Sequence, residues 1–165
     1  MKIKDIVLNI FLILMIFLPL TGAEEMRGLI IRGEDWAYES TKTVKEKNIS
    51  NIMSGAKDNG YNAVFFQVCE AGECFYPSEN DSWSTIFNES DPGFDPLRFA
   101  LGEAQRHGLQ FHVQLDVLGA YNIVNKPQSP DHLYTDHGKK WVLSDENFQP
   151  IKEDIYYYLD PGIPK

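Results

Sequence analysis

Carboxylate side chains follow two apolar segments of this sequence, at positions where they could share acid and base chemistry. Glu70 follows one apolar run and Asp116 follows another. Hydrolysis of a glycosidic bond normally needs two carboxyl groups about 5 to 10 Å apart, and adjacent strands lie about 4.8 Å apart. The pair is therefore a catalytic candidate, although most acidic loop residues in proteins are simply solvated. Further acidic candidates at strand ends are Glu34, Asp35 and Glu73.

Polar side chains also fall inside the apolar runs. Because side chains alternate along a strand, Gln67 and Cys69 would share one face of their strand. His112, Gln114 and Asp116 would likewise share one face of theirs. Polar residues near the C-terminal ends of strands in parallel α/β proteins tend to line a site, so we expect Gln67, His112 and Asp116 to contact a ligand. The alternative is that Gln67 and His112 are buried and bond each other and the nearby backbone.

Aromatic residues are frequent in the expected loops. A flat ring can stack on a sugar while its polar edge bonds hydroxyl groups, and the same ring can equally pack in a core. The aromatic candidates are Trp36, Trp83, Trp141, Tyr76, Tyr121 and Tyr134.

The two cysteines, Cys69 and Cys74, lie close together in the sequence. In an oxidising compartment they could close a small disulfide loop, which the loop-entropy model values at about 2 kcal/mol. Two unpaired thiols are an equally open alternative, because four intervening residues need not bring the Cα atoms within bridging range.

A loose group of residues at or after the third apolar run permits a metal hypothesis, since two imidazoles and a carboxylate can hold a catalytic zinc. The spacings match no tight ligand motif, so we expect no metal and no cofactor. A metal-dependent polysaccharide deacetylase is kept as a lesser alternative. The group consists of His112, Asp116, His132 and His137.

The elements that must position these residues alternate between strand and helix. Residues 27–32, 62–68 and 109–115 are apolar runs typical of strands buried on both faces. The spacing of apolar residues from Ile49 to Ala56 predicts a helix that ends near Asn59. A second helix is expected to begin at Asp95 and Pro96 and to stop at Gly108. This order indicates parallel βαβ units and an α/β fold.

Two long connections, 69–94 and 116–156, leave the C-terminal ends of strands, which is the side where parallel α/β proteins bind ligands. The second connection is expected to contain a hairpin between 139–143 and 155–159. Residues 160–165 look like the entrance to another helix. Three parallel strands cannot close a barrel, so we expect an exposed sheet edge and interpret the chain as a fragment or as a protein that needs a cover.

Residues 1–23 have the layout of a secretory signal peptide: a basic start, an apolar run and small residues before Glu24. The alternative, an uncleaved anchor, would need about 20 apolar residues, and this run is shorter. We expect export to the periplasm, cell envelope or exterior, without a stable membrane span after cleavage. Loss of Lys2, Lys4 and Asp5 would change the formal net charge from -9 to -10. Such a charge argues against nucleic acid as a partner, because phosphate binding depends on Lys and Arg.

Several spaced blocks resemble the bacterial glycosyl-hydrolase-like family ten. Arg27-Gly28 resembles its opening strand, and residues 62–68 with Gly72 and Tyr76-Pro77-Ser78 resemble its second-strand signature. The other blocks are Gly93-Phe94-Asp95-Pro96-Leu97, Glu103-Ala104, Gly108-Leu109, His112 and Tyr158-Leu159-Asp160-Pro161-Gly162. The resemblance covers roughly residues 27–164.

This resemblance implies a TIM-type (β/α)8 barrel in exported bacterial proteins that act on glycans such as cell-wall polysaccharide. It also implies an acidic motif on the next barrel strand, beyond Lys165. The sequence departs from the family pattern at Cys69, where Arg is usual, and at Glu70, where Pro is common. It departs again at residues 114–116, where a Trp-Phe-Asn type run is typical.

We therefore expect residues 24–165 to form the N-terminal part of such a barrel, with about three parallel strands, two helices and a long loop or hairpin after the third strand. The expected function is hydrolysis of O-glycosyl bonds in a polysaccharide or in the glycan of peptidoglycan. The expected alternative is a non-catalytic carbohydrate-binding or inactive barrel fragment, because the catalytic acids would lie beyond Lys165. The expected sub-site residues are Gln67, Tyr76, His112 and Asp116.

Overall fold

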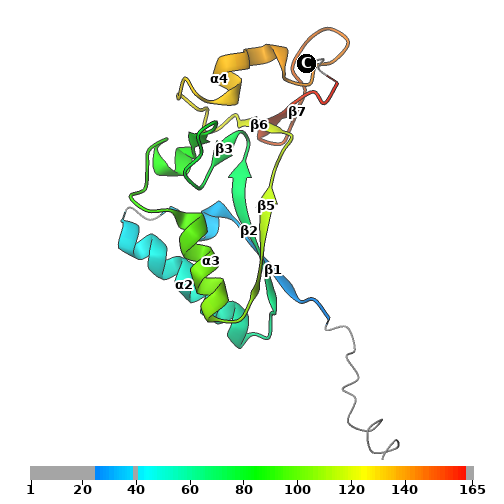
Figure 1. Ribbon diagram of the computed structural model, residues 1–165. Coiled ribbons are helices and arrows are strands. Elements are labelled where there is room, and N and C mark those ends of the chain that lie inside the picture. The colour runs from blue at the N-terminus through cyan, green and yellow to red at the C-terminus, as the bar shows by residue number, and fades with distance from the viewer. Residues whose placement is uncertain (1–24, 39–40, 163–165) are drawn as a thin grey trace, which may run out of the picture.

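The computed structural model describes residues 25–38 and 41–162. A five-stranded sheet carries two helices on one face, and a second, three-stranded sheet lies beyond the ends of its central strands (Figure 1). The expected signal peptide lies outside the described residues, as do residues 163–165 of the expected further helix. No helix in the described part of the chain is long and apolar enough to cross a membrane.

Three parallel strands form the centre of the larger sheet, as the sequence predicted. Strand β2 (Ala63–Glu70) pairs with β1 (Gly28–Ile31) on one side and with β5 (Gln110–Leu115) on the other. Beyond the end of β1, β2 continues into an antiparallel pairing with β3 (Glu73–Cys74), which in turn pairs with β4 (Ser82–Trp83). The result is a mixed α/β fold that is compatible with part of a barrel.

Both expected helices are present. Helix α2 (Lys42–Asp58) begins earlier than its apolar spacing indicated, after the side chain of Thr41 caps the amide of Val44. Helix α3 (Pro96–Arg106) begins where predicted, because the carboxylate of Asp95 accepts from the amide of Arg98 at 3.0 Å. The two helices contact each other and shield one face of the sheet.

The main core lies between these helices and the sheet. Ile49 and Met53 of α2 and Ala100 and Ala104 of α3 have no exposed surface. Phe66 of β2 packs against them and lies 5.7 Å from the ring of Trp36, centroid to centroid. The described core is therefore built on β2 and extends over the loop that follows β1.

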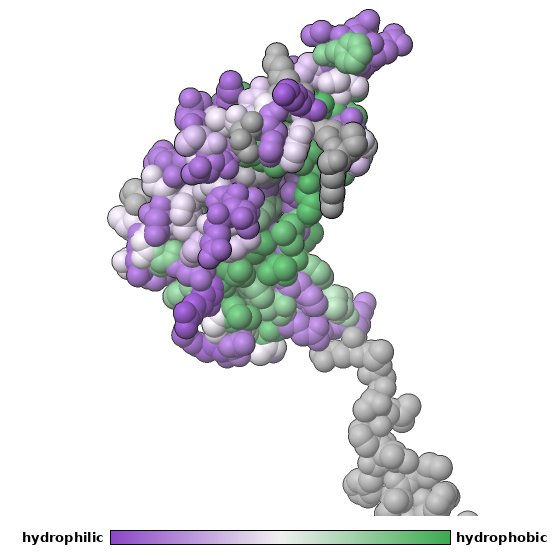
Figure 2. Space-filling model, turned by 45° about the horizontal axis from the view of Figure 1, so that its top comes forward, coloured by the Kyte–Doolittle hydropathy of each residue, from purple (hydrophilic) through white to green (hydrophobic). Residues whose placement is uncertain are grey.

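The prediction that all three strands are buried on both faces is wrong for β1 and β5. Ile30 of β1 is 56% exposed, while Val113 and Leu115 of β5 are 49% and 51% exposed. Of these three strands, only β2 has a described neighbouring strand along both edges, and the helices cover one face of the sheet. Figure 2 shows the resulting hydrophobic band along the β5 edge. The expected exposed edge is thus present among the described strands.

The second sheet differs from the expected hairpin. Strand β8 (Tyr156–Tyr158) pairs mainly with β6 (Gly119–Asn122) and with the short β7 (Lys152–Glu153). In the predicted partner segment, residues 139–143, Val142 forms an isolated bridge with Leu159. The start of that segment belongs instead to a 3-10 turn, Gly138–Lys140, which follows the short helix α4 (Leu133–His137). The rings of Tyr121 and Tyr157 stack across the β6–β8 pair, which explains the preferred partner.

Candidate functional site

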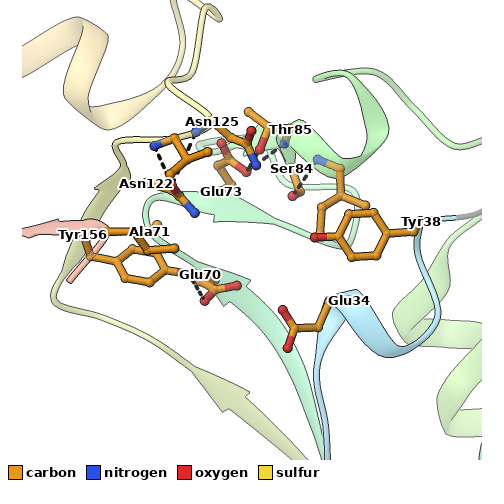
Figure 3. A pocket seen from close by; sticks show the side chains of 13 residues that line it. Glu34, Tyr38, Glu70, Ala71, Glu73, Ser84, Thr85, Asn122, Asn125 and Tyr156 are labelled. Carbon is orange, nitrogen blue, oxygen red and sulfur yellow. Dashed lines mark hydrogen bonds between the residues drawn. The ribbon is translucent and has the colours of Figure 1, made fainter.

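A polar pocket of about 200 Å³ lies at the C-terminal ends of β1 and β2. Segments from both sheets meet there, so that residues from the turn after the first described strand to Tyr156 of the last strand lie around one cavity (Figure 3). The lining combines three carboxylates, two tyrosines and two asparagines: Glu34, Glu70, Glu73, Tyr38, Tyr156, Asn122 and Asn125. Hydroxyl and amide groups beside carboxylates are suited to binding a hydroxyl-rich ligand.

Glu34 is positioned by a 3-10 turn, η1 (Gly33–Asp35), that directly follows β1. The buried amide of Gly33 donates a 2.9 Å hydrogen bond to the side-chain oxygen of Gln67 on β2. A side chain on Gly33 would overlap the ring of Phe75. Gln67 therefore fixes the turn that presents Glu34, and only glycine fits at its first residue.

Glu70, the last residue of β2, accepts a hydrogen bond from a residue of the second sheet. The hydroxyl of Tyr156 on β8 donates a 2.9 Å hydrogen bond to Oε1 of Glu70. Burial, followed by the bond to Glu70, raises the pKa of Tyr156 above its usual value. Tyr156 is therefore held as a hydrogen-bond donor to the carboxylate. Figure 3 shows Glu34 and Glu70 directed into the same cavity.

Glu73, the first residue of β3, is the most buried of the three carboxylates. Its Oε2 accepts from the amide of Thr85 at 2.7 Å and from the hydroxyl of Thr85 at 3.0 Å. Burial nevertheless raises the pKa of Glu73. A raised pKa in a buried carboxyl group is typical of a general acid, while the two bonds also anchor the 3-10 turn η2 (Thr85–Phe87).

The turn that carries Glu70 and Glu73 is held in three ways. Cys69 and Cys74 are joined by a disulfide across it, with Cα atoms 4.2 Å apart. Ala71 and Gly72 both have positive φ, as a two-residue hairpin turn of type I′ requires. The carbonyl of Ala71 lies 3.1 Å from Nε2 of His132. The two carboxylates on either side of this turn are therefore firmly placed.

His132 connects the turn to the segment after β6. Its Nδ1 accepts from the amide of Tyr134 at 3.0 Å, so Nε2 carries the proton and donates to Ala71. The side chain has no exposed surface, and burial lowers the pKa of His132. His132 thus acts as a neutral bridge between α4 and the β2–β3 turn.

The structure places Glu70 in the pocket and Gln67 behind it, but it does not bring Asp116 there. Asp116 accepts from the amides of Leu118 and Gly119, at 3.2 and 3.0 Å, and shapes the turn from β5 to β6. The ring of His112 stacks on Phe65 at 4.9 Å. Gln67 and His112 therefore have different partners, and no hydrogen bond joins these two described side chains.

Tyr76 packs partly buried against the main core rather than lining the pocket. Ligand contact by Tyr76, His112 and Asp116 stays a prediction. Of the other aromatic candidates, Trp36 is a core residue with 1% exposure, while Tyr121 and Tyr134 pack on each other in a small second core.

Sequence reasoning missed Tyr38, Tyr156 and the two asparagines of the pocket. Tyr38 stands four residues after Glu34, beyond the first strand, which is a position on the expected ligand side. Tyr156 is the first of three consecutive tyrosines. Because successive residues of a strand face opposite sides, the run places a tyrosine on each face of the strand, and this was a usable signal. Asn122 is the last residue of the unpredicted strand β6, and Asn125 lies in the segment that follows it.

The metal hypothesis finds no support in the described part of the chain. No group of three or more His, Cys, Asp or Glu residues there could hold an ion. Two of its four candidates have other roles, since Asp116 shapes a turn and His132 bridges two backbone groups.

Comparisons with known proteins place these features in context. The family model for glycosyl hydrolase-like 10 proteins matches residues 25–165. Glycosyl hydrolase YngK of Bacillus subtilis (strain 168) is 31% identical over 140 residues, which cover 79% of this chain and 25% of that protein. Glycosyl hydrolase DigH of Escherichia coli (strain K12) is 30% identical over 175 residues, which cover 87% of this chain and 36% of that protein. The chain thus spans between a quarter and two fifths of these relatives.

Proposed function

Because this chain belongs to the glycosyl hydrolase-like 10 family, we propose that it acts on glycans by hydrolysing O-glycosyl bonds. The observation that carries this proposal is the convergence of Glu34 and Glu70 on one cavity, with Tyr156 bonded to Glu70. Two relatives from different bacteria bear the name glycosyl hydrolase. Paired carboxyl groups are the usual requirement for that reaction.

In this proposal Glu70 is the carboxylate that attacks the anomeric carbon or activates the water that does so, and Glu34 is the general acid that protonates the leaving oxygen as the glycosidic bond breaks. The Tyr156 hydroxyl would hold one oxygen of Glu70, leaving the other directed to the substrate. Asn122 and Asn125 would bond sugar hydroxyls from the opposite wall. The role assigned to Glu34 replaces the one that the sequence suggested for Asp116, whose side chain is engaged in a turn.

The proposed architecture is the beginning of a TIM-type barrel. Three parallel strands with helices on one face support it, together with a pocket at the strand C-termini, where such barrels hold their sites. The exposed side chains of β1 and β5 would lie against the remaining wall of the barrel. The activity of the whole protein belongs to this proposal, because the chain matches only part of its relatives.

We further propose that the protein is exported and that its target is a polysaccharide or the glycan of peptidoglycan. The basic start, apolar run and small residues before Glu24 support export. The acidic composition supports a ligand without many negative charges.

The test is release of new reducing ends from purified glycan strands of peptidoglycan and from a panel of plain polysaccharides. Folded wild-type chain should release them, and Glu70→Gln and Glu34→Gln should each lower the rate by at least about a hundredfold, as expected for loss of acid or base catalysis. Asp116→Asn serves as the comparison and should retain most of the activity. Equal activity in Glu70→Gln would refute the assignment.

A non-catalytic glycan-binding protein is the second candidate. It is favoured by one observation, namely that Glu70 and Glu73 both accept hydrogen bonds from within the protein. Carboxylates with such partners can serve to position a ligand without reacting. Binding of glycan strands by the folded chain, without any new reducing ends, would support this candidate over the hydrolase.

A further inference from the structure

We propose that Tyr38 marks the boundary between two consecutive saccharide subsites in one groove, so that the protein takes an internal stretch of an uncharged glycan chain rather than a single sugar. This inference rests on the proposed function and adds the length and charge of the substrate to it. It concerns a residue to which sequence reasoning assigned no role.

The first support is continuity of the groove. A second hollow, of about 540 Å³, adjoins the pocket of about 200 Å³. The two share Tyr38, Thr85, Ile86 and Asn125 in their linings. Because both hollows use the same wall, a ligand seated at Glu70 can extend along Ile86 into the second hollow without leaving the surface.

The second support is the exposure of Tyr38. Its side chain is 69% exposed, and its hydroxyl is directed toward the cavity (Figure 3). An aromatic ring left in water at the shared wall is available to stack on the face of a pyranose ring. Val124, also 69% exposed, adds apolar surface to the inner pocket. The boundary region can therefore bury the apolar faces of a sugar while the amide of Asn125 bonds its edge.

The third support is the chemistry of the outer hollow. Its far end is lined by Asn88, Glu89, Lys126 and Gln128, in which amide groups accompany one acid and one base. The backbone amide of Gln128 donates to Glu89, and the ammonium group of Lys126 lies 5.6 Å from the centre of the Tyr134 ring. Side-chain amides thus remain the main polar groups for a second sugar.

The charge balance of the whole groove selects among glycans. Four carboxyl groups line it, those of Glu34, Glu70, Glu73 and Glu89, and the lining residues of the two hollows include one ammonium group, that of Lys126. Outside the lining, the guanidinium group of Arg32 lies 3.6 Å from Glu34, so acidic groups still outnumber basic ones by four to two. A polymer with a carboxylate on each unit would be repelled, whereas an uncharged chain would not. The substrate class is therefore a neutral glycan of at least two linked units.

The test measures affinity against chain length. Binding of β-1,4-linked N-acetylglucosamine and glucose oligomers of one to six units to the intact chain is followed by calorimetry, with chromatography to detect turnover. We expect affinity in a neutral series to rise by about tenfold or more between one and three units and then to level off. Galacturonic acid oligomers of equal length should bind at least about tenfold more weakly.

Tyr38→Ala should abolish the gain with length, and because Tyr38 lines both hollows it should weaken the longer oligomers by a larger factor than a single unit, while Tyr38→Phe should keep most of the gain. Phe148→Ala is the matched control, because Phe148 is 88% exposed and lines neither hollow. Affinity that does not depend on length, or an equal loss at every length in Tyr38→Ala, would overturn the two-subsite inference and leave the proposed function standing. Failure of the folded chain to bind any neutral oligomer would overturn the inference of a neutral two-unit substrate, whereas the proposed function falls only if the chain also releases no reducing ends from peptidoglycan glycan strands and plain polysaccharides.

Discussion

The hydroxyl of Tyr156 lies 2.9 Å from the carboxylate of Glu70, and this bond joins residues 86 positions apart in the sequence. It connects β8 of the second sheet to the end of β2 in the first. The wall of the pocket is thus supplied by a strand that belongs to a different sheet from the residue it supports. Formation of the pocket therefore depends on the second sheet as much as on the parallel strands.

Removing this bond should weaken the site more than the fold. Tyr156→Phe keeps the ring and deletes only the hydroxyl, so the free energy of unfolding should fall by about 1 kcal/mol. The rate of reducing-end release should fall by about tenfold, because one oxygen of Glu70 would no longer be held. Urea denaturation and the release assay measure the two effects. Tyr158→Phe on the same strand lies outside the pocket lining, and equal losses in both variants would contradict this role of Tyr156.

The disulfide between Cys69 and Cys74 should stabilise the chain by about 2 kcal/mol, since it closes a short loop in the unfolded state. The double variant Cys69→Ser, Cys74→Ser should show this loss in urea denaturation. Wild-type protein in reductant should show the same loss, and reductant should not affect the variant. Identical denaturation midpoints with and without reductant in the wild type would indicate two free thiols.

The buried carboxyl group of Glu73 should make stability depend on pH. Because burial raises its pKa above 4.5, the folded state holds the proton more strongly than the unfolded state. Its contribution to stability is therefore present at low pH and is lost as pH rises through the raised pKa. Glu73→Gln should gain stability relative to the wild type between pH 4 and pH 7, as measured by denaturation midpoints. Glu79→Gln, at an exposed position, should not gain stability over this pH range. A stability difference between Glu73→Gln and the wild type that does not change with pH would contradict the account.

His132 should make stability depend on pH with the opposite sign. Burial lowers its pKa below 6.5, so the folded state holds the proton more weakly than the unfolded state, and stability is lost as pH falls through the lowered pKa. His132→Asn can still cap the amide of Tyr134 but loses the bond to Ala71, at a cost of about 1 kcal/mol at neutral pH. The difference between the two proteins should shrink on acidification. His107→Asn is the matched control, and a difference that persists unchanged at low pH would contradict the bridging role.

The βαβ core could be predicted because its signals are local. The spacing of Ile49, Met53 and Ala56 marked the buried face of α2, and the pair Asp95 and Pro96 marked the start of α3. Glu70 could be placed at a ligand-facing strand end for the same reason, since it directly follows a strongly apolar run.

The second sheet could not be predicted because its pairing is decided by contacts between distant segments. The sequence offered residues 139–143 as the partner of residues 155–159, whereas in the structure β8 pairs with β6, where the ring of Tyr121 stacks on that of Tyr157. The turn at Asp116 was not predicted either, and contact of Asp116 with a ligand stays a prediction. Its side chain turns back to bond Leu118 and Gly119, a local alternative to lining a site that Asp residues commonly adopt.

Mapping of oligosaccharide binding by NMR tests the central claim most directly, because it locates the site without requiring turnover. Titration of the isotope-labelled chain with a neutral N-acetylglucosamine oligomer should shift the amide signals of Glu34, Glu70, Asn122 and Tyr156, all around the pocket. Signals of His112 and Asp116 should move little. Shifts centred on His112 and Asp116, with the pocket residues unchanged, would contradict the placement of the glycan site at the ends of β1 and β2.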